Sequence, residues 1–410
     1  MRRKRDYSLF PMNYSLYFHI PFCTHRCAYC DFNTYAGQES LIPAYVEALC
    51  REIEMVAASA PARLPVHTIF FGGGTPSLLT PKQFEQILQT VRDLFNLSNL
   101  ETSLEANPGT VTLDSLHGLR LAGFNRISFG VQSFNADELR QLERIHDPFD
   151  VLEAVRWARQ AGFDNLNLDL IYGLPEQPLD RWQATVKRAV DLGPEHLSLY
   201  ALTIEQGTPY GRWAQRGLLP VPDPDLAAEM YEWAADYLEG QGYEQYEISN
   251  WSKPGFQCKH NLQYWRNRPY LGFGAGAHGY AGGYRYSNVL RIKTYVERLT
   301  KPESRVSNLA FPLPPSTVNR QLITPQVEMQ ETMITGLRLT REGVSATTFR
   351  DRFGRDLVEV FGKEINELVG LGLLEWAHPS PCGIGAGGEV LRLTKRGRLL
   401  GNQVFMRFVG

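Results

Sequence analysis

Hydrophobic positions in the first half of the chain follow two alternating patterns. Short apolar runs rich in β-branched and aromatic residues recur at 14–20, 66–71, 100–106, 125–131, 165–171 and 196–202. Between them lie longer segments whose apolar residues recur every three to four positions, as on one face of a helix, at 42–58, 81–95, 150–162 and 180–193. The pattern therefore predicts six βα units.

Alternation of strands and helices implies a parallel sheet covered by helices. Six units of roughly thirty residues fit an incomplete (β/α)6 barrel and an open doubly wound sheet equally well. In both folds the loops after the strands form the ligand site. Polar or glycine-rich stretches follow the first five strands, with the sequences PFCTHRCAYC, GGGTP, EANPG, GVQSF and YGLP. One rim of the fold is therefore expected to carry the chemistry.

The pattern changes after residue 225. A helical segment at 226–240 leads into a loop-rich stretch at 257–283, and the proline-rich FPLPPS at 311–316 marks a boundary. Beyond it the order helix, helix, strand, strand, helix resembles a winged helix. The expected division is an α/β barrel, a linking segment and a winged-helix-like α+β domain, at residues 1–225, 226–310 and 311–410.

Charge and composition narrow the choice of partners. The whole chain has a net charge of -2, and residues 311–410 hold 12 Lys plus Arg against 10 Asp plus Glu, a surplus of 2. A nucleic-acid domain usually concentrates basic residues in one stripe, so we expect no nucleic acid here. Neither a signal peptide nor a membrane span is predicted. Six cysteines, three of them clustered, favour a reducing cytoplasm over a disulfide framework.

The clustered cysteines stand directly after the first strand as C-x3-C-x2-C, at Cys23, Cys27 and Cys30. Three thiolates on one loop can hold three corners of a small inorganic group. A structural zinc needs a fourth ligand and would have to take His19 or His25. A cubane iron–sulfur cluster would instead leave one iron free for an outside ligand. The spacing alone leaves both interpretations open.

The surroundings of this loop resemble the radical S-adenosylmethionine (SAM) superfamily. Tyr29 fills the aromatic slot of C-x3-C-x-aromatic-C, and GGGTP follows the second strand. The resemblance implies a [4Fe-4S] cluster on the three cysteines, SAM bound to the open iron, and a one-electron donor for the cluster. Glycines at 72–74 suit the close approach of backbone to a ligand, although a tight turn after a strand would explain them too.

Further motifs resemble the oxygen-independent coproporphyrinogen III oxidase group, which includes the HemW-type heme chaperones. They are YFHIPFC, FFGGGTPS, EANPG, SFGVQSF, NLDLIYGLPEQ and GTPYG. By this resemblance, one set of residues is expected to hold SAM through carboxylates, a guanidinium fork and backbone amides: Tyr17, Tyr29, Gly72, Gly73, Gly74, Thr75, Glu105, Gln132, Arg144 and Asp169.

Two features separate the branches of this group. The oxidase branch carries a further cysteine two positions after the cluster triplet, where this chain has Phe32, and a longer N-terminal arm than the 22 residues that precede Cys23. The chaperone branch carries an HNxxYW motif, present here as His260, Asn261, Tyr264 and Trp265.

The HNxxYW motif suits heme chemically. A neutral imidazole can ligate heme iron and the aromatic rings offer flat faces, with the Cys258 thiolate as an alternative ligand. The competing interpretation is a loop that caps the barrel, in which His260 is hydrogen-bonded and the aromatic rings belong to the core.

The resemblance therefore implies a heme chaperone that delivers heme to apo-hemoproteins, among them respiratory ones. The alternatives are an oxidase that decarboxylates coproporphyrinogen III propionates and a zinc-stabilised binding module. No residue is assigned a catalytic role. The sequence leaves open whether SAM is cleaved, whether the chain forms a homodimer, and whether the basic residues 1–5 contact a membrane surface.

Overall fold

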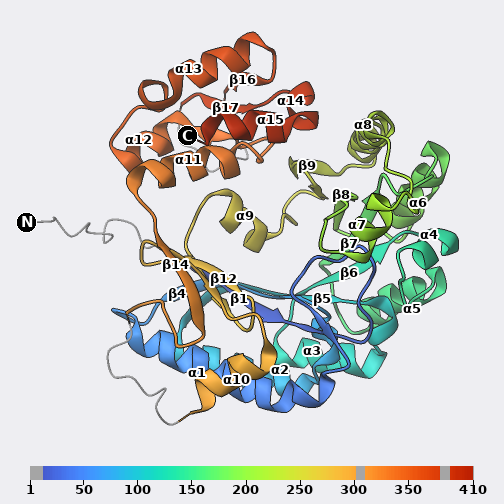
Figure 1. The fold of residues 1–410 in the computed structure, drawn as a ribbon, viewed down its shortest axis with the longest axis vertical. Helices are drawn as coiled ribbons and strands as arrows, with labels where there is room; N and C mark the ends of the chain where they lie inside the picture. Colours follow the sequence, from blue (N-terminus) through green and yellow to red (C-terminus); the bar gives the residue numbers. More distant parts are fainter. Residues whose placement is uncertain (1–12, 302–309, 379–387, 410) are drawn as a thin grey trace, which may run out of the picture.

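The computed structural model describes residues 13–301, 310–378 and 388–409. Six parallel strands lie side by side in chain order, as listed here: β1 (Tyr14–Ile20), β4 (Pro65–Gly73), β5 (Asn96–Ala106), β6 (Arg126–Gln132), β7 (Leu166–Tyr172) and β8 (His196–Ala201). A doubly wound sheet would reverse this order at a switch point. The unreversed order confirms the predicted barrel (Figure 1).

The barrel is incomplete because β1 and β8 pair with other strands instead of with each other. The free edge of β1 pairs in parallel with β11 (Tyr270–Phe273), and the sheet continues through β12 (His278–Ala281), β13 (Tyr284–Asn288) and β14 (Thr317–Leu322). At the other edge β8 pairs with β10 (Asn250–Ser252), which pairs with β9 (Glu244–Glu247). The expected linking segment at 226–310 therefore supplies five strands to the barrel sheet.

Amphipathic helices cover the outer face of the barrel: α1 (Ile42–Ser59), α2 (Pro81–Leu94), α3 (Leu113–Ala122), α5 (Pro148–Gln160), α6 (Leu179–Asp191), α8 (Pro224–Gly240) and α10 (Ile292–Thr300). Their starts are marked in the sequence, since Thr80, Thr112 and Asp147 each form a capping box at the first turn. Within the described ranges, no helix is long and apolar enough to cross a membrane.

The C-terminal part has an apolar core of its own. Its main elements are α11 (Pro325–Gly336), β15 (Val344–Ser345), α12 (Ala346–Phe353), α13 (Leu357–Gly370), β16 (Leu374–Ala377) and β17 (Val390–Leu393). The three strands form an antiparallel sheet in the order β15-β17-β16. This is the strand and helix order of a winged helix. It is completed by α14 (Lys395–Leu399) and α15 (Gly401–Phe405).

Half-buried ion pairs join this part to the barrel. They are Arg266–Glu342, Arg285–Glu331 and Arg338–Glu247, with nitrogen–oxygen distances of 2.7, 2.6 and 3.1 Å. The short helix α9 (Lys259–Trp265) lies between the two parts (Figure 1). Arg266, the residue directly after α9, forms the ion pair with Glu342, so the HNxxYW segment contacts the C-terminal part as well as the barrel.

A buried carboxylate joins α1 to the added strands. Glu52 accepts hydrogen bonds from the Gly274 amide (2.7 Å), Asn288 (2.8 Å), Tyr295 (2.6 Å) and Ser316. Burial raises the pKa of this carboxyl, while the four donors oppose the rise. The carboxylate thereby satisfies donors from four separate segments.

We expect Glu52→Ala to lower the free energy of unfolding by about 2–4 kcal/mol, because four buried donors lose their acceptor. Urea denaturation at pH 7, followed by tryptophan fluorescence, measures the change. Glu54→Ala, at an exposed position of the same helix, is the matched control and should stay within about 0.5 kcal/mol of the parent. Equal effects of the two substitutions would contradict this role for Glu52.

Candidate functional site

The three cysteines lie on one loop at the rim where the parallel strands end. Cys23 is buried at the end of β2 (Phe22–Cys23), and Cys27 and Cys30 are half-buried free thiols joined by a turn. The Thr75 hydroxyl lies 3.5 Å from Cys23 Sγ and donates to it, and Arg144 Nη1 donates to Cys27 Sγ at 3.4 Å. Residues that follow three different strands therefore meet at the thiols.

Burial makes the thiols of Cys23 and Cys30 hard to ionise without a nearby cation. It raises the pKa of Cys23 and of Cys30, although hydrogen bonds lower both in part. Arg144 supplies a positive charge beside Cys27 and is held by the Gly130 carbonyl at 2.7 Å. Its buried Nε has no hydrogen-bond partner among the described residues, so the guanidinium keeps a free donor near the thiols.

The donor set fits an iron–sulfur cluster better than a single zinc ion. Within the described ranges, no three His, Cys, Asp or Glu side chains converge on one point that could hold a metal ion. His19 has both ring nitrogens engaged, by the Tyr17 hydroxyl at 3.0 Å and the Asn33 carbonyl at 2.9 Å. His25 pairs with Glu143. A cubane cluster binds each thiolate at a separate iron and needs no such convergence.

Tyr29 secures the cysteine loop by packing. Its ring contacts Tyr210 edge-on at 6.5 Å, and the Tyr210 amide donates to the Ala28 carbonyl at 3.1 Å. Both residues belong to a small apolar cluster with Leu142 and Leu174. The aromatic slot of the cysteine motif is therefore a packing anchor between the cysteine loop and the loops after β6, β7 and β8.

The glycine run at the end of β4 is required by the close approach of β1. Gly73 has a φ of +107°, and a Cβ there would lie 2.4 Å from the His19 ring. A Cβ on Gly74 would lie 2.6 Å from the Phe22 carbonyl oxygen. The Gly73 amide donates to Glu105 Oε2 at 3.1 Å. Backbone packing therefore explains these glycines, and it leaves the Glu105 carboxylate at the rim.

Two carboxylates lie on the inner face of the barrel. Burial and repulsion by Asp169 raise the pKa of Glu105 to about 7. Asp169 accepts hydrogen bonds from Ser128 and Asn167, both at 2.8 Å. Gln132 follows a bulge in β6 and has a φ of +69°, an uncommon conformation that redirects the strand end. The predicted rim residues thus lie together at the strand ends.

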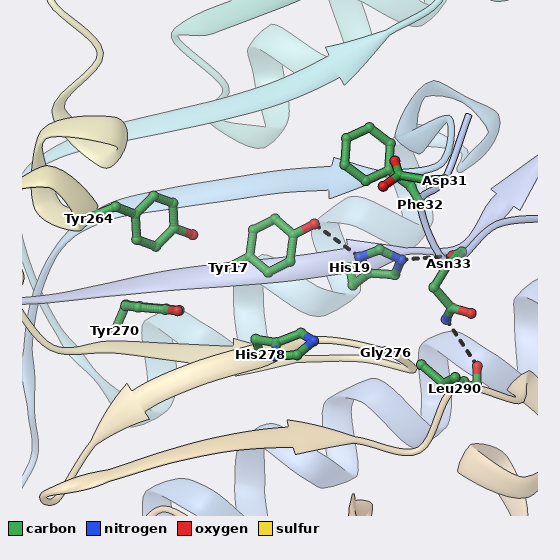
Figure 2. Close-up of a pocket in the computed structure, with 10 residues that line it drawn as sticks. All are labelled: Tyr17, His19, Asp31, Phe32, Asn33, Tyr264, Tyr270, Gly276, His278 and Leu290. Carbon is green, nitrogen blue, oxygen red and sulfur yellow. Dashed lines mark hydrogen bonds between the residues drawn. The ribbon is translucent and has the colours of Figure 1, made fainter. Parts of the chain in front are cut away.

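A cavity of about 390 Å³ opens between β1 and the hairpin that joins β11 to β12 (Figure 2). Its lining residues are Tyr17, His19, Asp31, Phe32, Asn33, Tyr264, Tyr270, Gly276, His278 and Leu290. Segment 31–33 directly follows Cys30, so the cavity borders the cysteine loop. The sequence motifs predicted only Tyr17 and Tyr264 among these residues. For Gly276 and His278 the available signal was the glycine-rich GFGAGAHGY at 272–280.

His260 of the HNxxYW helix α9 lies in the protein interior. The ring is buried, with Nδ1 2.9 Å from Thr68 Oγ1 and Nε2 2.8 Å from the Tyr264 hydroxyl. Thr68 donates its own proton to Ser15, so Nδ1 donates to Thr68 and the Nε2 lone pair accepts from Tyr264. Both ring nitrogens are therefore engaged within the protein, and the predicted ligation of heme iron by His260 would require one of these hydrogen bonds to break.

Cys258, the alternative ligand for heme iron, is also buried. Burial raises its pKa to about 12, so the thiol stays protonated, 3.8 Å from Glu101. Glu101 accepts the first amides of α9, from Lys259 and His260, both at 3.1 Å. A carboxylate at this end of a helix stabilises it.

The remaining members of the motif diverge. Trp265 lies under the Arg338 guanidinium at 4.3 Å, at the junction with the C-terminal part, and Asn261 is half-buried. Tyr264 is the member that reaches the cavity.

Comparison with known proteins agrees with this arrangement. The family model described as the radical SAM superfamily matches residues 17–189, and the HemN C-terminal domain matches 323–377. The heme chaperone HemW of Bacillus subtilis is 39% identical over 399 residues, which cover 97% of this chain and 99% of that protein. The chain belongs to the HemW family. Membership of the radical SAM superfamily implies a [4Fe-4S] cluster and SAM.

Other HemW relatives show similar agreement. The protein of Mycobacterium tuberculosis is 38% identical over 97% of this chain and 95% of its own length, and that of Escherichia coli is 44% identical over 65% and 69%. Among solved structures, coproporphyrinogen III oxidase (HemN) of Escherichia coli aligns with a TM-score of 0.79 at 25% identity, covering 98% of this chain and 91% of that one. This chain and the oxidase therefore share one architecture.

The buried position of His260 predicts a structural effect of its removal. We expect His260→Ala to lower the free energy of unfolding by about 2–3 kcal/mol, because Thr68 and Tyr264 lose their partner and a cavity remains. His117→Ala, at an exposed position of α3, should change it by less than about 0.5 kcal/mol. Urea denaturation at pH 7.5 measures both.

The same pair of variants tests the titration of His260. Burial lowers its pKa to about 3, against about 6.5 in an unfolded chain. Its contribution to stability is complete above pH 6.5 and is lost as the pH falls toward 3. Between pH 6.5 and 4.5 the parent should therefore lose stability more steeply than His260→Ala, whereas parallel pH profiles would exclude a buried neutral imidazole.

Proposed function

We propose that the chain binds heme and delivers it to apo-hemoproteins, with an iron–sulfur cluster and SAM at the barrel rim. The observation that carries the proposal is an aromatic cavity that borders the cysteine loop, in a chain of the HemW family. Tyr17, Tyr264 and Tyr270 supply flat apolar faces of the kind that suit a porphyrin. The proposed acceptors include respiratory hemoproteins, and the proposed compartment is a reducing cytoplasm.

In this proposal Cys23, Cys27 and Cys30 hold the cluster and leave one iron for SAM. When bound, the cluster and SAM supply one-electron chemistry, for which a partner protein provides the electron. Arg144 has a free donor for the SAM carboxylate, and Glu105 is an acceptor for its amino group or ribose. Asp169 and Gln132 lie at the same rim, and Thr75 lies against the cluster ligand Cys23.

The iron content of the reconstituted chain tests whether the three cysteines hold the cluster. We expect Cys27→Ser to reduce the iron bound after anaerobic reconstitution from about four per chain to below one, because a cubane loses one of its three protein ligands. Circular dichroism should stay unchanged, since Cys27 is half-buried on a loop.

The matched control is Cys50→Ser, because Cys50 is buried on α1 and lies outside the cysteine loop. This variant should keep its full iron content. Full iron in Cys27→Ser, or equal loss in both variants, would show that the loop does not ligate the cluster.

Heme binding is separable from oxidase activity. Phe32 occupies the position at which the oxidase branch carries its further cysteine, so this chain lacks that thiol. The Phe32 side chain lines the cavity and is 63% exposed. We expect hemin titration to produce a saturable Soret shift, and the hemin-loaded chain to transfer its heme to an apo-hemoprotein. Incubation of the reconstituted chain with coproporphyrinogen III and SAM should yield no protoporphyrinogen. Turnover of that substrate would overturn the chaperone function in favour of the oxidase.

A further inference from the structure

The hairpin between β11 and β12 is pressed against β1 by its glycines. Gly274 and Gly276 have φ angles of +102° and +81°. A Cβ on Gly274 would lie 2.5 Å from the His19 carbonyl oxygen, and one on Gly276 would lie 2.4 Å from Asn33 Nδ2. Small residues at these positions are therefore required for the backbone to reach the end of β1. The hairpin forms one wall of the cavity.

His278 begins β12 at this wall. Its side chain is exposed, while its neighbours Ala277 and Gly279 are buried. Figure 2 shows Tyr264, Tyr17 and His19 in a row along one side of the cavity, with Tyr270 and His278 on the facing side. Neither ring nitrogen of His278 has a hydrogen-bond partner in the described part of the chain.

The other eight histidines are placed differently. His19, His146, His196 and His260 are buried with both ring nitrogens hydrogen-bonded. The remaining four lie outside the set that lines the cavity: His25, which pairs with Glu143, and His67, His117 and His378. Among the nine histidines, all within the described ranges, His278 alone combines exposure, free nitrogens and a place on the cavity wall.

We propose that this cavity binds an iron porphyrin and that His278 is its axial ligand. The inference rests on the proposed function and assigns its iron ligand. A neutral imidazole ligates heme iron, and the tyrosine rings of the facing walls cover an aromatic macrocycle. His260 then has a supporting role, because its Nε2 accepts the Tyr264 hydroxyl and fixes the orientation of that ring. The porphyrin would lie next to segment 31–33, directly after the cluster ligand Cys30.

Hemin titration of the full-length chain tests this assignment, with absorption and electron paramagnetic resonance as readouts. We expect His278→Ala to weaken hemin binding at least tenfold and to lose the imidazole-ligated spectrum, and added imidazole to restore that spectrum. His278→Met should bind hemin with a changed spectrum, because a thioether replaces the imidazole. His117→Ala, at an exposed position of α3 outside the cavity lining, should keep the parent spectrum and affinity.

Metal-free protoporphyrin IX separates coordination from packing. Its affinity should change less than twofold in His278→Ala, because it has no iron to ligate. If the parent chain binds no hemin, the proposed function fails. If the parent binds hemin and His278→Ala keeps its spectrum, the function stands and the ligand assignment fails. If His278→Ala lost affinity for hemin and for metal-free porphyrin equally, axial ligation would also be excluded, and His278 would contribute only packing contacts.

Discussion

The architecture depends on β1 having a parallel neighbour on each side. β4 pairs with one edge and β11 with the other, so β1 is an internal strand and the barrel cannot close onto it. A parallel neighbour requires a long crossover. Here that crossover brings α9 between the barrel and the C-terminal part, and it returns the glycine-rich hairpin to the end of β1. The four donors to Glu52 hold these added strands against α1.

This placement makes one strand serve two neighbouring sites. β1 leads into the cysteine loop, and its inward residues Tyr17 and His19 line the cavity. His19 links the two, because it contacts the Tyr17 hydroxyl and the carbonyl of Asn33, three residues after Cys30. Burial lowers the pKa of His19, so a neutral ring holds this contact without adding a charge beside the thiols.

Sequence patterns predicted those features of the fold and the site that depend on local periodicity and residue spacing. The six strands and the three-cysteine loop could be located because alternation and ligand spacing are local properties. The pairing of β11 with β1 could not, because a four-residue strand in a glycine-rich stretch carries no clear period. His260 resembled a ligand in the motif, but its partner Thr68 lies 192 positions away in the chain. His278 has no polar motif around it, and only the surrounding glycines indicated close backbone packing.

The HNxxYW motif is best understood as a junction. Glu101 of β5 accepts the first amides of α9, which fixes the helix to the barrel. Its other end is fixed to the C-terminal part, by Arg338 over Trp265 and by the bidentate pair of Arg266 with Glu342. Tyr264 lies between these two anchors and reaches the cavity. The orientation of a cavity wall therefore depends on contacts with both parts of the chain, which gives the C-terminal part a physical role at a distance from the cysteine loop.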